Sequence, residues 1–282
     1  MISSFLARRS FLALCLAALS TAACAQDKPA ILDYQPEVGQ AGKDVVWVPT
    51  SQALVDKMLD LARVTSRDYV IDLGSGDGRT VITAAKRGAR ALGIEYNPDM
   101  VELSQRNAAK EGVGNQAKFM KADLFGSDFS QATVITMFLL PDINLKLRPK
   151  ILDLKPGTRI VSNSFTMGEW QHDRSVNATE KEGCQSYCTA YLWIVPAKVE
   201  GSWTLPDGEL TLKQSFQMIT GTLRAGGRET PVKGRLNGDQ LSFKAGDVQY
   251  NGQVTGNAIK GTVKAGGGTT DWSATRGGRA AS

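Results

Sequence analysis

The chain has 282 residues, enough for two domains with separate cores, and its 42% hydrophobic and 22% charged residues are ordinary for a globular protein. Its net charge is +5, but without Arg8 and Arg9 of a predicted export signal the 33 basic residues become 31 against 28 acidic ones, too small an excess to indicate nucleic-acid binding. His172 is the single histidine, which argues against histidine-based metal sites and Ser-His-Asp triads, and we expect no bound metal.

Residues 1–25 have the three parts of an export signal: an arginine pair, an apolar run too short to span a membrane comfortably, and small residues ending at Ala25. The arginine pair and the residues after it resemble the twin-arginine motif of proteins exported in the folded state. We therefore expect a periplasmic protein without a transmembrane span in the mature chain. Lipidation at Cys24 is the alternative to cleavage after Ala25.

Residues 26–48 contain scattered prolines and glycines and predict an arm that runs over the surface. From residue 49 to 197 the pattern is that of one domain, opened by a helix with Thr50 or Ser51 as its N-cap. Strands and helices then alternate, which is typical of a mostly parallel Rossmann-like sheet with helices on both faces. The predicted strands are 69–73, 90–95, 116–120, 132–138 and 158–163, and the predicted helices are 79–88, 98–111 and 143–152.

Three glycines, Gly74, Gly76 and Gly78, stand between the first predicted strand and its helix. Without Cβ atoms they allow a ligand to approach the backbone, next to a helix N-terminus that favours negative charge. Glu95 ends the second strand, 21 residues after Gly74, where a carboxylate can accept both hydroxyls of a ribose. These residues predict a nucleoside-cofactor site.

Acidic residues stand at three successive strand ends, Asp72, Glu95 and Asp123. In such sheets, ligands bind outside the carboxyl ends of the strands. Asp123 could accept from an adenine amine, and Leu124 could contact the ring. Each acid alone could be a helix cap, but the three together favour a site.

Three segments resemble the cofactor motifs of class I methyltransferases that use S-adenosylmethionine: Asp72-Leu-Gly-Ser-Gly-Asp-Gly78, Gly93-Ile-Glu-Tyr-Asn97 and Ala122-Asp-Leu-Phe125. Five segments are also similar to one subgroup, the lysine methyltransferases of the mitochondrial ADP/ATP carrier and the ATP synthase c-subunit with their bacterial relatives. These segments are Trp47-Val-Pro-Thr-Ser51, the run from Asp72 to Arg79, Phe138-Leu-Leu-Pro141, Lys146-Leu-Arg-Pro149 and Pro156-Gly-Thr-Arg-Ile-Val-Ser162. The resemblance covers roughly residues 46–197. It departs at Thr166-Met-Gly-Glu169, where the family tends to carry a proline.

The resemblance implies a seven-stranded sheet whose last two strands, about 174–181 and 188–196, form an antiparallel hairpin. It also implies S-adenosylmethionine as cofactor, with the glycine turn around the methionine part, Glu95 at the ribose and Asp123 at the adenine. The residues expected to bind the cofactor are Asp72, Gly74, Ser75, Gly76, Gly78, Glu95, Tyr96, Asp123 and Leu124.

Methyl transfer from a sulfonium needs in-line positioning, exclusion of water and an unprotonated acceptor rather than acid–base groups, and we assign no catalytic base. The end of the fourth strand lacks the acidic or amide residue, prolines and aromatic typical of nucleobase-amine methylation. An apolar substrate channel is expected instead, from Phe138, Leu140, Pro141, Phe165 and Trp170, with packing in the core as the alternative for each of them.

Cys184 and Cys188 are separated by three residues and, in an oxidising compartment, predict a disulfide across a turn. After residue 197 the composition changes. Residues 198–282 are rich in glycine and threonine, with period-two alternation between turn signals, and predict an antiparallel β-meander closed as a small barrel or folded as a sandwich. This second domain has no catalytic cluster and is expected to serve stability or docking, with an internal ligand cavity as the alternative.

The sequence thus predicts an S-adenosylmethionine-dependent methyltransferase acting on a protein lysine, with membrane-associated proteins among its substrates and no nucleic-acid partner. An exported location conflicts with repeated use of a cytosolic cosubstrate. The alternative is therefore an exported binding protein that keeps the fold for a nucleoside-like ligand without catalysis. The oligomeric state stays open.

Overall fold

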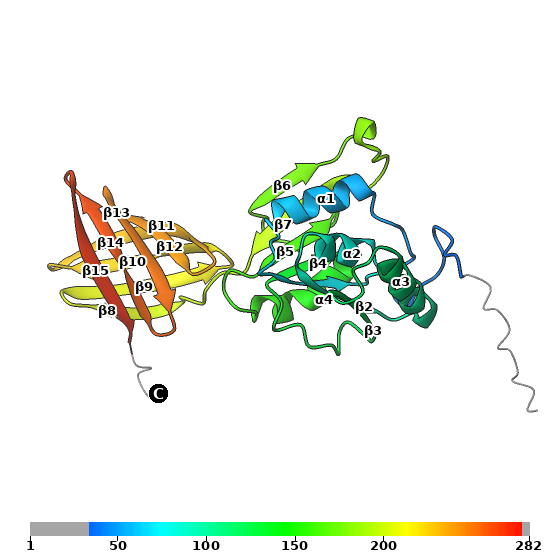
Figure 1. Cartoon of the computed structure of the whole chain (residues 1–282). Coiled ribbons are helices and arrows are strands. Elements are labelled where there is room, and N and C mark those ends of the chain that lie inside the picture. The colour runs from blue at the N-terminus through cyan, green and yellow to red at the C-terminus, as the bar shows by residue number, and fades with distance from the viewer. Residues whose placement is uncertain (1–33, 278–282) are drawn as a thin grey trace, which may run out of the picture. The chain divides into compact units, whose positions relative to one another are not determined.

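The computed structural model describes residues 34–277, which contain one mixed sheet with its helices and one closed β-barrel (Figure 1). The first 33 residues, with the predicted export signal, lie outside the described part. The elements of the first region are α1 (Gln52–Leu61), β1 (Tyr69–Leu73), α2 (Arg79–Lys86), β2 (Arg90–Glu95), α3 (Pro98–Lys110), β3 (Ala117–Lys121), β4 (Val134–Met137), α4 (Pro141–Leu152), β5 (Arg159–Asn163), β6 (Arg174–Asn177), the 3-10 helix η1 (Glu180–Glu182) and β7 (Thr189–Ile194).

The mixed sheet has the strand order β3-β2-β1-β4-β5-β7-β6, with β7 antiparallel to both of its neighbours. This confirms the expected seven-stranded sheet with an antiparallel hairpin at its end. The strand order reverses between β1 and β4, because β2 and β3 lie on one side of β1 while β4 and β5 lie on the other. Such a switch point is where ligands bind in this kind of sheet.

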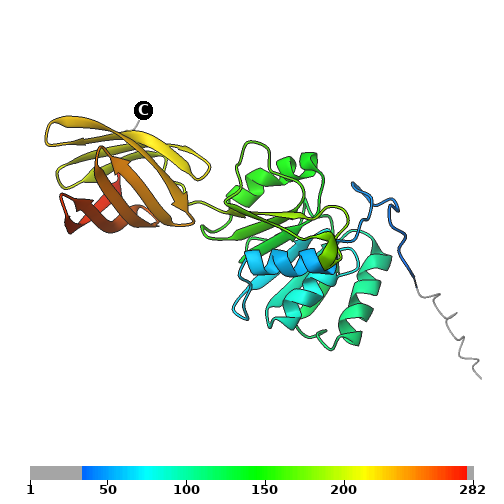
Figure 2. The same ribbon diagram turned by 90° about the horizontal axis from the view of Figure 1, so that it is seen from above.

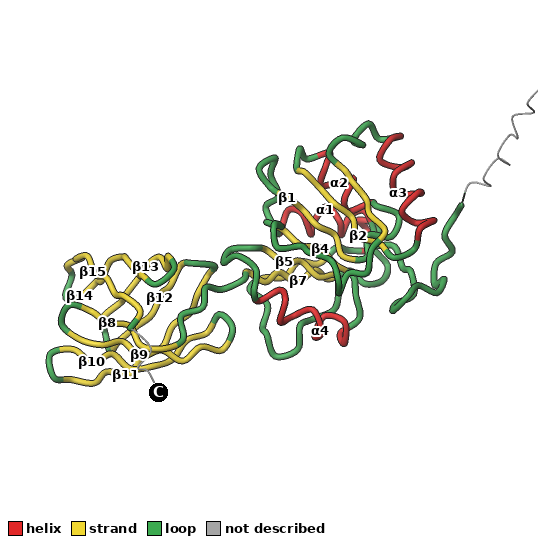
Figure 3. Tube along the Cα trace, turned by 90° about the horizontal axis from the view of Figure 1, so that it is seen from below, coloured by secondary structure: helices red, strands yellow, loops and turns green. Residues whose placement is uncertain are grey.

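Helices cover both faces of the sheet, as Figures 2 and 3 show. α1, α2 and α3 bury apolar side chains such as Leu54, Val81 and Ala108 in one core cluster. α4 buries Ile143, Leu147 and Ile151 in a second cluster on the opposite face. Two apolar layers around a sheet are the arrangement that the alternating pattern predicts.

Two of the differences between the expected and the observed element bounds have a clear local cause. α4 begins at Pro141 rather than 143, because proline fits the first helical position, where its missing N–H costs nothing. β6 ends at Asn177, since a Thr179–Glu182 capping box starts the 3-10 helix η1 where the predicted strand 174–181 would continue.

The second region is a closed antiparallel barrel of eight strands with the order β10-β11-β12-β13-β14-β15-β8-β9. It resolves the choice between barrel and sandwich, since β8 pairs with both β9 and β15 and so closes the meander. Trp203, Leu236 and Phe243 are among its fully buried core residues. Its strands are β8 (Gly201–Leu205), β9 (Gly208–Ser215), β10 (Met218–Ala225), β11 (Arg228–Asn237), β12 (Gln240–Ala245), β13 (Val248–Thr255), β14 (Ala258–Ala265) and β15 (Gly268–Arg276).

Among the described residues, no helix is both long and apolar enough to cross a membrane.

Asp68, just before β1, joins several parts of the mixed sheet through one carboxylate. It accepts hydrogen bonds from the Thr65 backbone N–H (2.8 Å) and the Thr133 hydroxyl (2.8 Å), and it pairs with Arg159 at the start of β5. Its side chain is only 8% exposed. Burial alone would raise the pKa of Asp68, but the bonds from Thr65, Thr133 and Arg159 outweigh it and hold the pKa below 3.8.

We expect Asp68→Asn to destabilise the protein by about 2 kcal/mol at pH 7, because hydrogen bonds to a charged group contribute most when their donors are partly buried. Since the folded-state pKa is lowered, this contribution is complete above 3.8 and is lost as the pH falls through the lowered value. Urea unfolding at pH 7 and below 4 measures both effects. Asp60→Asn, at an exposed ion pair with Arg87, is the control and should change stability by less than about 1 kcal/mol. Equal effects of the two substitutions would contradict this account.

Candidate functional site

A cavity of about 480 Å³ lies at the carboxyl ends of the parallel strands. Its walls include Gly74 after β1, Tyr96 after β2, Asp123 after β3 and Phe138 after β4, together with residues 40–50 of the N-terminal arm. These segments meet because parallel strands end at the same edge of the sheet.

The glycine turn after β1 is bound to the neighbouring strand. The backbone N–H groups of Gly74 and Ser75 both donate to the Ile94 carbonyl, at 2.9 and 3.1 Å. Gly76 has φ +54°, and a Cβ there would lie 2.6 Å from the Trp47 indole nitrogen. A Cβ on Gly93 of β2 would lie 2.5 Å from the Ser75 hydroxyl. Glycine at 76 and 93 is therefore required for the close packing of the turn on β2 and on the arm.

The Glu95 carboxylate is fixed by two backbone donors. Gly76 N–H donates to Oε2 and Asn97 N–H to Oε1, each at 2.9 Å. Each oxygen keeps a free lone pair, so the same carboxylate can accept from a ligand hydroxyl on the cavity side.

Asp123 is engaged by a lysine of the arm. Lys43 Nζ lies 2.7 Å from Asp123 Oδ2, while the Phe125 backbone N–H donates to Oδ1 at 2.9 Å. The hydrogen bonds from Lys43 and Phe125 lower the pKa of Asp123, and the bond to Asp123 raises the pKa of Lys43. The Lys43 ammonium also lies over the Tyr96 ring, 5.1 Å from its centroid. The arm thus places a cation against two residues expected to bind the cofactor.

Asp72 is the most deeply buried acid of the site. It accepts a 2.6 Å hydrogen bond from the Thr136 hydroxyl of β4. Burial raises the pKa of Asp72 to about 7; Thr136 opposes the shift, and the nearby charges of Glu95 and Asp77 add to it. At neutral pH this carboxyl is therefore divided between its neutral and charged forms.

All predicted cofactor residues except Gly78 line the cavity. Gly78 instead takes a left-handed conformation as the N-cap of α2, and a Cβ there would lie 2.8 Å from the Phe119 ring. The residues that line the cavity are Asp72, Gly74, Ser75, Gly76, Glu95, Tyr96, Asp123 and Leu124.

The residues expected in the substrate channel divide into two groups. Phe138, Leu140 and Phe165 line the cavity. Pro141 is exposed at the start of α4, and Trp170 is fully buried beside Trp193, with its carbonyl accepting from the Trp193 indole at 2.7 Å; neither lines the cavity. An aromatic residue in a motif does not by itself show whether it packs in the core or faces a ligand.

Among the cavity residues that were not expected from the sequence are Lys43, Trp47 and Tyr187. The arm, expected to run over the surface, folds back through an Ala41–Val46 bridge and brings Lys43 and Trp47 into the cavity wall. The sequence contained one indication that the arm belongs to the site, because the motif that starts at Trp47 begins in the arm, before the first predicted helix.

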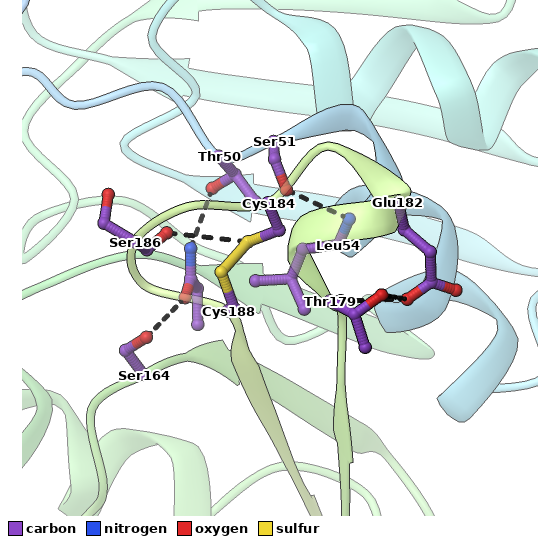
Figure 4. Close-up of a disulfide and its surroundings, with 10 residues drawn as sticks. Thr50, Ser51, Leu54, Ser164, Thr179, Glu182, Cys184, Ser186 and Cys188 are labelled. Carbon is purple, nitrogen blue, oxygen red and sulfur yellow. Dashed lines mark hydrogen bonds between the residues drawn. A yellow bond between two sulfur atoms is a disulfide. The ribbon is translucent and has the colours of Figure 1, made fainter.

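Tyr187 comes from the loop between β6 and β7, where Cys184 and Cys188 form a disulfide (Figure 4). Its ring lies 5.2 Å from that of Phe138 and 6.0 Å from that of Phe165, and the latter two are 6.0 Å apart. The feature of the sequence that could have pointed to Tyr187 as a site residue is its position between Cys184 and Cys188. His172 packs instead on the Tyr191 ring, at 4.8 Å, which is a structural role.

Comparison with known proteins relates this site to methyltransferases. Residues 72–174 match the model of the ANTKMT methyltransferase domain. A protein-lysine N-methyltransferase of Saccharolobus islandicus is 40% identical over 154 residues, which is 54% of this chain and 94% of that protein. The human lysine N-methyltransferase of the ATP synthase c-subunit is 36% identical over 45% of this chain and 54% of its own length.

Among solved structures, the chain is similar to an RNA methyltransferase from Salinibacter ruber in complex with S-adenosyl-L-homocysteine. The sequence identity is 46% and the TM-score 0.50, over 54% of this chain and 96% of that one.

The raised pKa of Asp72 predicts a pH dependence of stability. Between pH 3.8 and about 7 the folded state keeps a proton that the unfolded state has released, so the free energy of unfolding falls as the pH rises, by at most about 1.4 kcal/mol per pH unit. Asp72→Asn keeps an acceptor for Thr136 and removes this slope. We expect thermal unfolding of the ligand-free protein between pH 5 and 8 to show a smaller loss of stability in the variant. Parallel curves would contradict the raised pKa.

Proposed function

Because the chain belongs to the family of S-adenosylmethionine-dependent methyltransferases with the ANTKMT-type domain, we propose that it methylates a lysine side chain of a protein substrate. Two relatives with this activity in their names, from an archaeon and from human, support lysine as the acceptor. The observation that carries the proposal is the composition of the cavity. One part is formed by the glycine turn and by acids held in place by hydrogen bonds, and the adjoining part is formed by aromatic rings.

The residues of the cavity fit S-adenosylmethionine, which supplies an activated methyl group on a positively charged sulfur. Asp72 and the glycine turn would hold the methionine part, since a buried carboxyl divided between charge states can become fully charged beside a cation. Glu95, oriented by Gly76 and Asn97, would accept from the ribose hydroxyls. Asp123 would accept from the adenine amine in place of Lys43.

The apolar side of the cavity suits an amine acceptor. Phe138, Leu140 and Phe165 present hydrocarbon to the cavity, which would cover the methylene stem of a lysine side chain. An amine must lose its proton before it can accept a methyl group. Water exclusion and alignment would then supply the rate enhancement that acid–base groups supply in other enzymes.

RNA is a second candidate acceptor, because the Salinibacter ruber protein bears that activity in its name. The small excess of basic over acidic residues and the apolar Phe138–Pro141 segment favour a protein acceptor. The third possibility is a non-catalytic binding protein with the same fold, and an experiment must distinguish it from the two methyltransferases.

We propose an exported location for this activity. The export signal predicted for residues 1–25 is one support. The Cys184–Cys188 disulfide is the other, because disulfides persist mainly in oxidising compartments.

We expect isothermal titration of residues 26–282 to detect binding of S-adenosylmethionine and S-adenosylhomocysteine but not of NAD. Glu95→Ala should abolish this binding, since it removes the ribose acceptor and the bond that holds the glycine turn. Glu111→Ala, at an exposed ion pair with Lys86, is the control and should bind as the wild type does. Unchanged affinity of the Glu95 variant would refute the ribose assignment.

Incubation with cell-envelope extract and methyl-tritiated S-adenosylmethionine should place label in protein, as methylated lysine after hydrolysis. The label should be sensitive to protease and resistant to ribonuclease. Label in RNA would support the second candidate. Cofactor binding without label in either fraction would support a non-catalytic binding protein.

A further inference from the structure

We propose that Phe138, Phe165 and Tyr187 form a subsite for the alkylammonium end of the acceptor, and that the Cys184–Cys188 disulfide sets its shape by holding Tyr187 in place. This inference rests on the proposed function, since it names how an amine acceptor would be held. It adds a residue, Tyr187, and a structural element, the disulfide loop, to the acceptor side of the cavity.

The three rings form one group at the cavity wall. Phe138 and Phe165 are stacked with their centroids 6.0 Å apart, and Tyr187 meets the Phe138 ring edge-on at 5.2 Å. The Tyr187 side chain is half exposed, although a large aromatic residue gains stability from burial. Exposed aromatic rings in a cavity provide faces that attract a cation and surfaces that cover its hydrocarbon stem.

The backbone at this group is held in an unfavourable conformation. Tyr187 has φ +54°, and Ser164, the residue before Phe165, has φ +58°. Non-glycine residues rarely adopt this left-handed region, and where they do the surrounding contacts enforce it, often at functional sites. Here Ser164 N–H donates to the Thr189 carbonyl at 2.7 Å, and its hydroxyl donates to Asn163 at 2.8 Å.

The loop that carries Tyr187 is anchored at its other end on α1 (Figure 4). Glu182 accepts from the Thr179 backbone N–H at 2.9 Å and pairs with Lys57 of α1 at 2.8 Å. Cys184 is buried in the same core cluster as Leu54 of α1. The disulfide then ties Cys188, next to Tyr187, to this anchored cysteine.

Tyr187 is therefore the one ring of the group that comes from a loop rather than from the end of a central strand. Phe138 follows β4 and Phe165 follows β5, both in the middle of the sheet. Loss of the disulfide would free the loop next to Tyr187 while leaving the glycine turn, Glu95 and Asp123 in place. Loss of the disulfide should therefore weaken acceptor binding and leave cofactor binding unchanged.

The first test compares wild type, Tyr187→Ala, Tyr187→Phe and the double variant Cys184→Ser/Cys188→Ser. Titration with S-adenosylhomocysteine should give the same affinity for all four. With methyl-tritiated S-adenosylmethionine and serial dilutions of envelope extract, Tyr187→Ala should need at least 10-fold more extract for half-maximal rate, and Tyr187→Phe should stay within twofold of wild type. The cysteine variant should fall between them. Met218→Ala, at an equally exposed side chain of the barrel, is the control.

The second test separates failure of this inference from failure of the proposed function. Calorimetric titration of the S-adenosylhomocysteine complex with n-pentyltrimethylammonium reports the subsite without any turnover. Binding that is weakened at least fivefold by Tyr187→Ala supports the subsite even where the extract yields no label. Wild-type kinetics for Tyr187→Ala, or no binding of the ammonium probe to the wild type, would overturn the inference. The tyrosine variants decide the matter even if the cysteine variant does not fold.

Discussion

The hydrogen bond from Gly76 N–H to the Glu95 carboxylate connects the two strand ends on which the rest of the site is built. The turn after β1 is also bound through Gly74 and Ser75 to Ile94, so it follows β2 closely. This approach is possible because neither Gly76 nor Gly93 carries a Cβ. A bond from a backbone N–H to a charged acceptor contributes about 1.5–3 kcal/mol when partly buried, so the acid holds the turn in addition to its proposed role at the ribose.

Much of the sheet could be predicted because local patterns determine it. β1 and β2 have the predicted bounds, since runs of apolar residues next to glycine and acidic residues leave little choice of strand ends. The acids at the strand ends could be predicted for the same reason, because parallel strands bring their carboxyl ends together. The choice between a closed barrel and a sandwich could not be made from the sequence, because closure depends on pairing between β8 and β15, which are separated by most of the domain.

The sequence was less informative about segments that meet only in the folded chain. Lys43 and Tyr187 are far apart in sequence and line the same cavity. The periodicity of apolar residues predicts local elements and cannot predict that two such distant residues lie together. Trp170 had the right residue type and spacing for a channel but packs into the core beside Trp193. The cavity takes its lining from residues between 40 and 187, all of them in the region of the mixed sheet.

The contact between Lys43 and Asp123 means that this acid of the cavity is neutralised before any ligand enters. Lys43 neutralises Asp123, and a proton partly neutralises Asp72. On the proposed arrangement the neutral adenine amine would replace Lys43 at Asp123, and the ammonium group of the cofactor would replace the proton of Asp72. The protein would release a proton from Asp72 and free Lys43 as the cofactor binds. S-adenosylhomocysteine keeps the adenine and the ammonium group but lacks the sulfonium charge, so the attraction between the carboxylates of the cavity and the ligand would weaken once the methyl group is transferred.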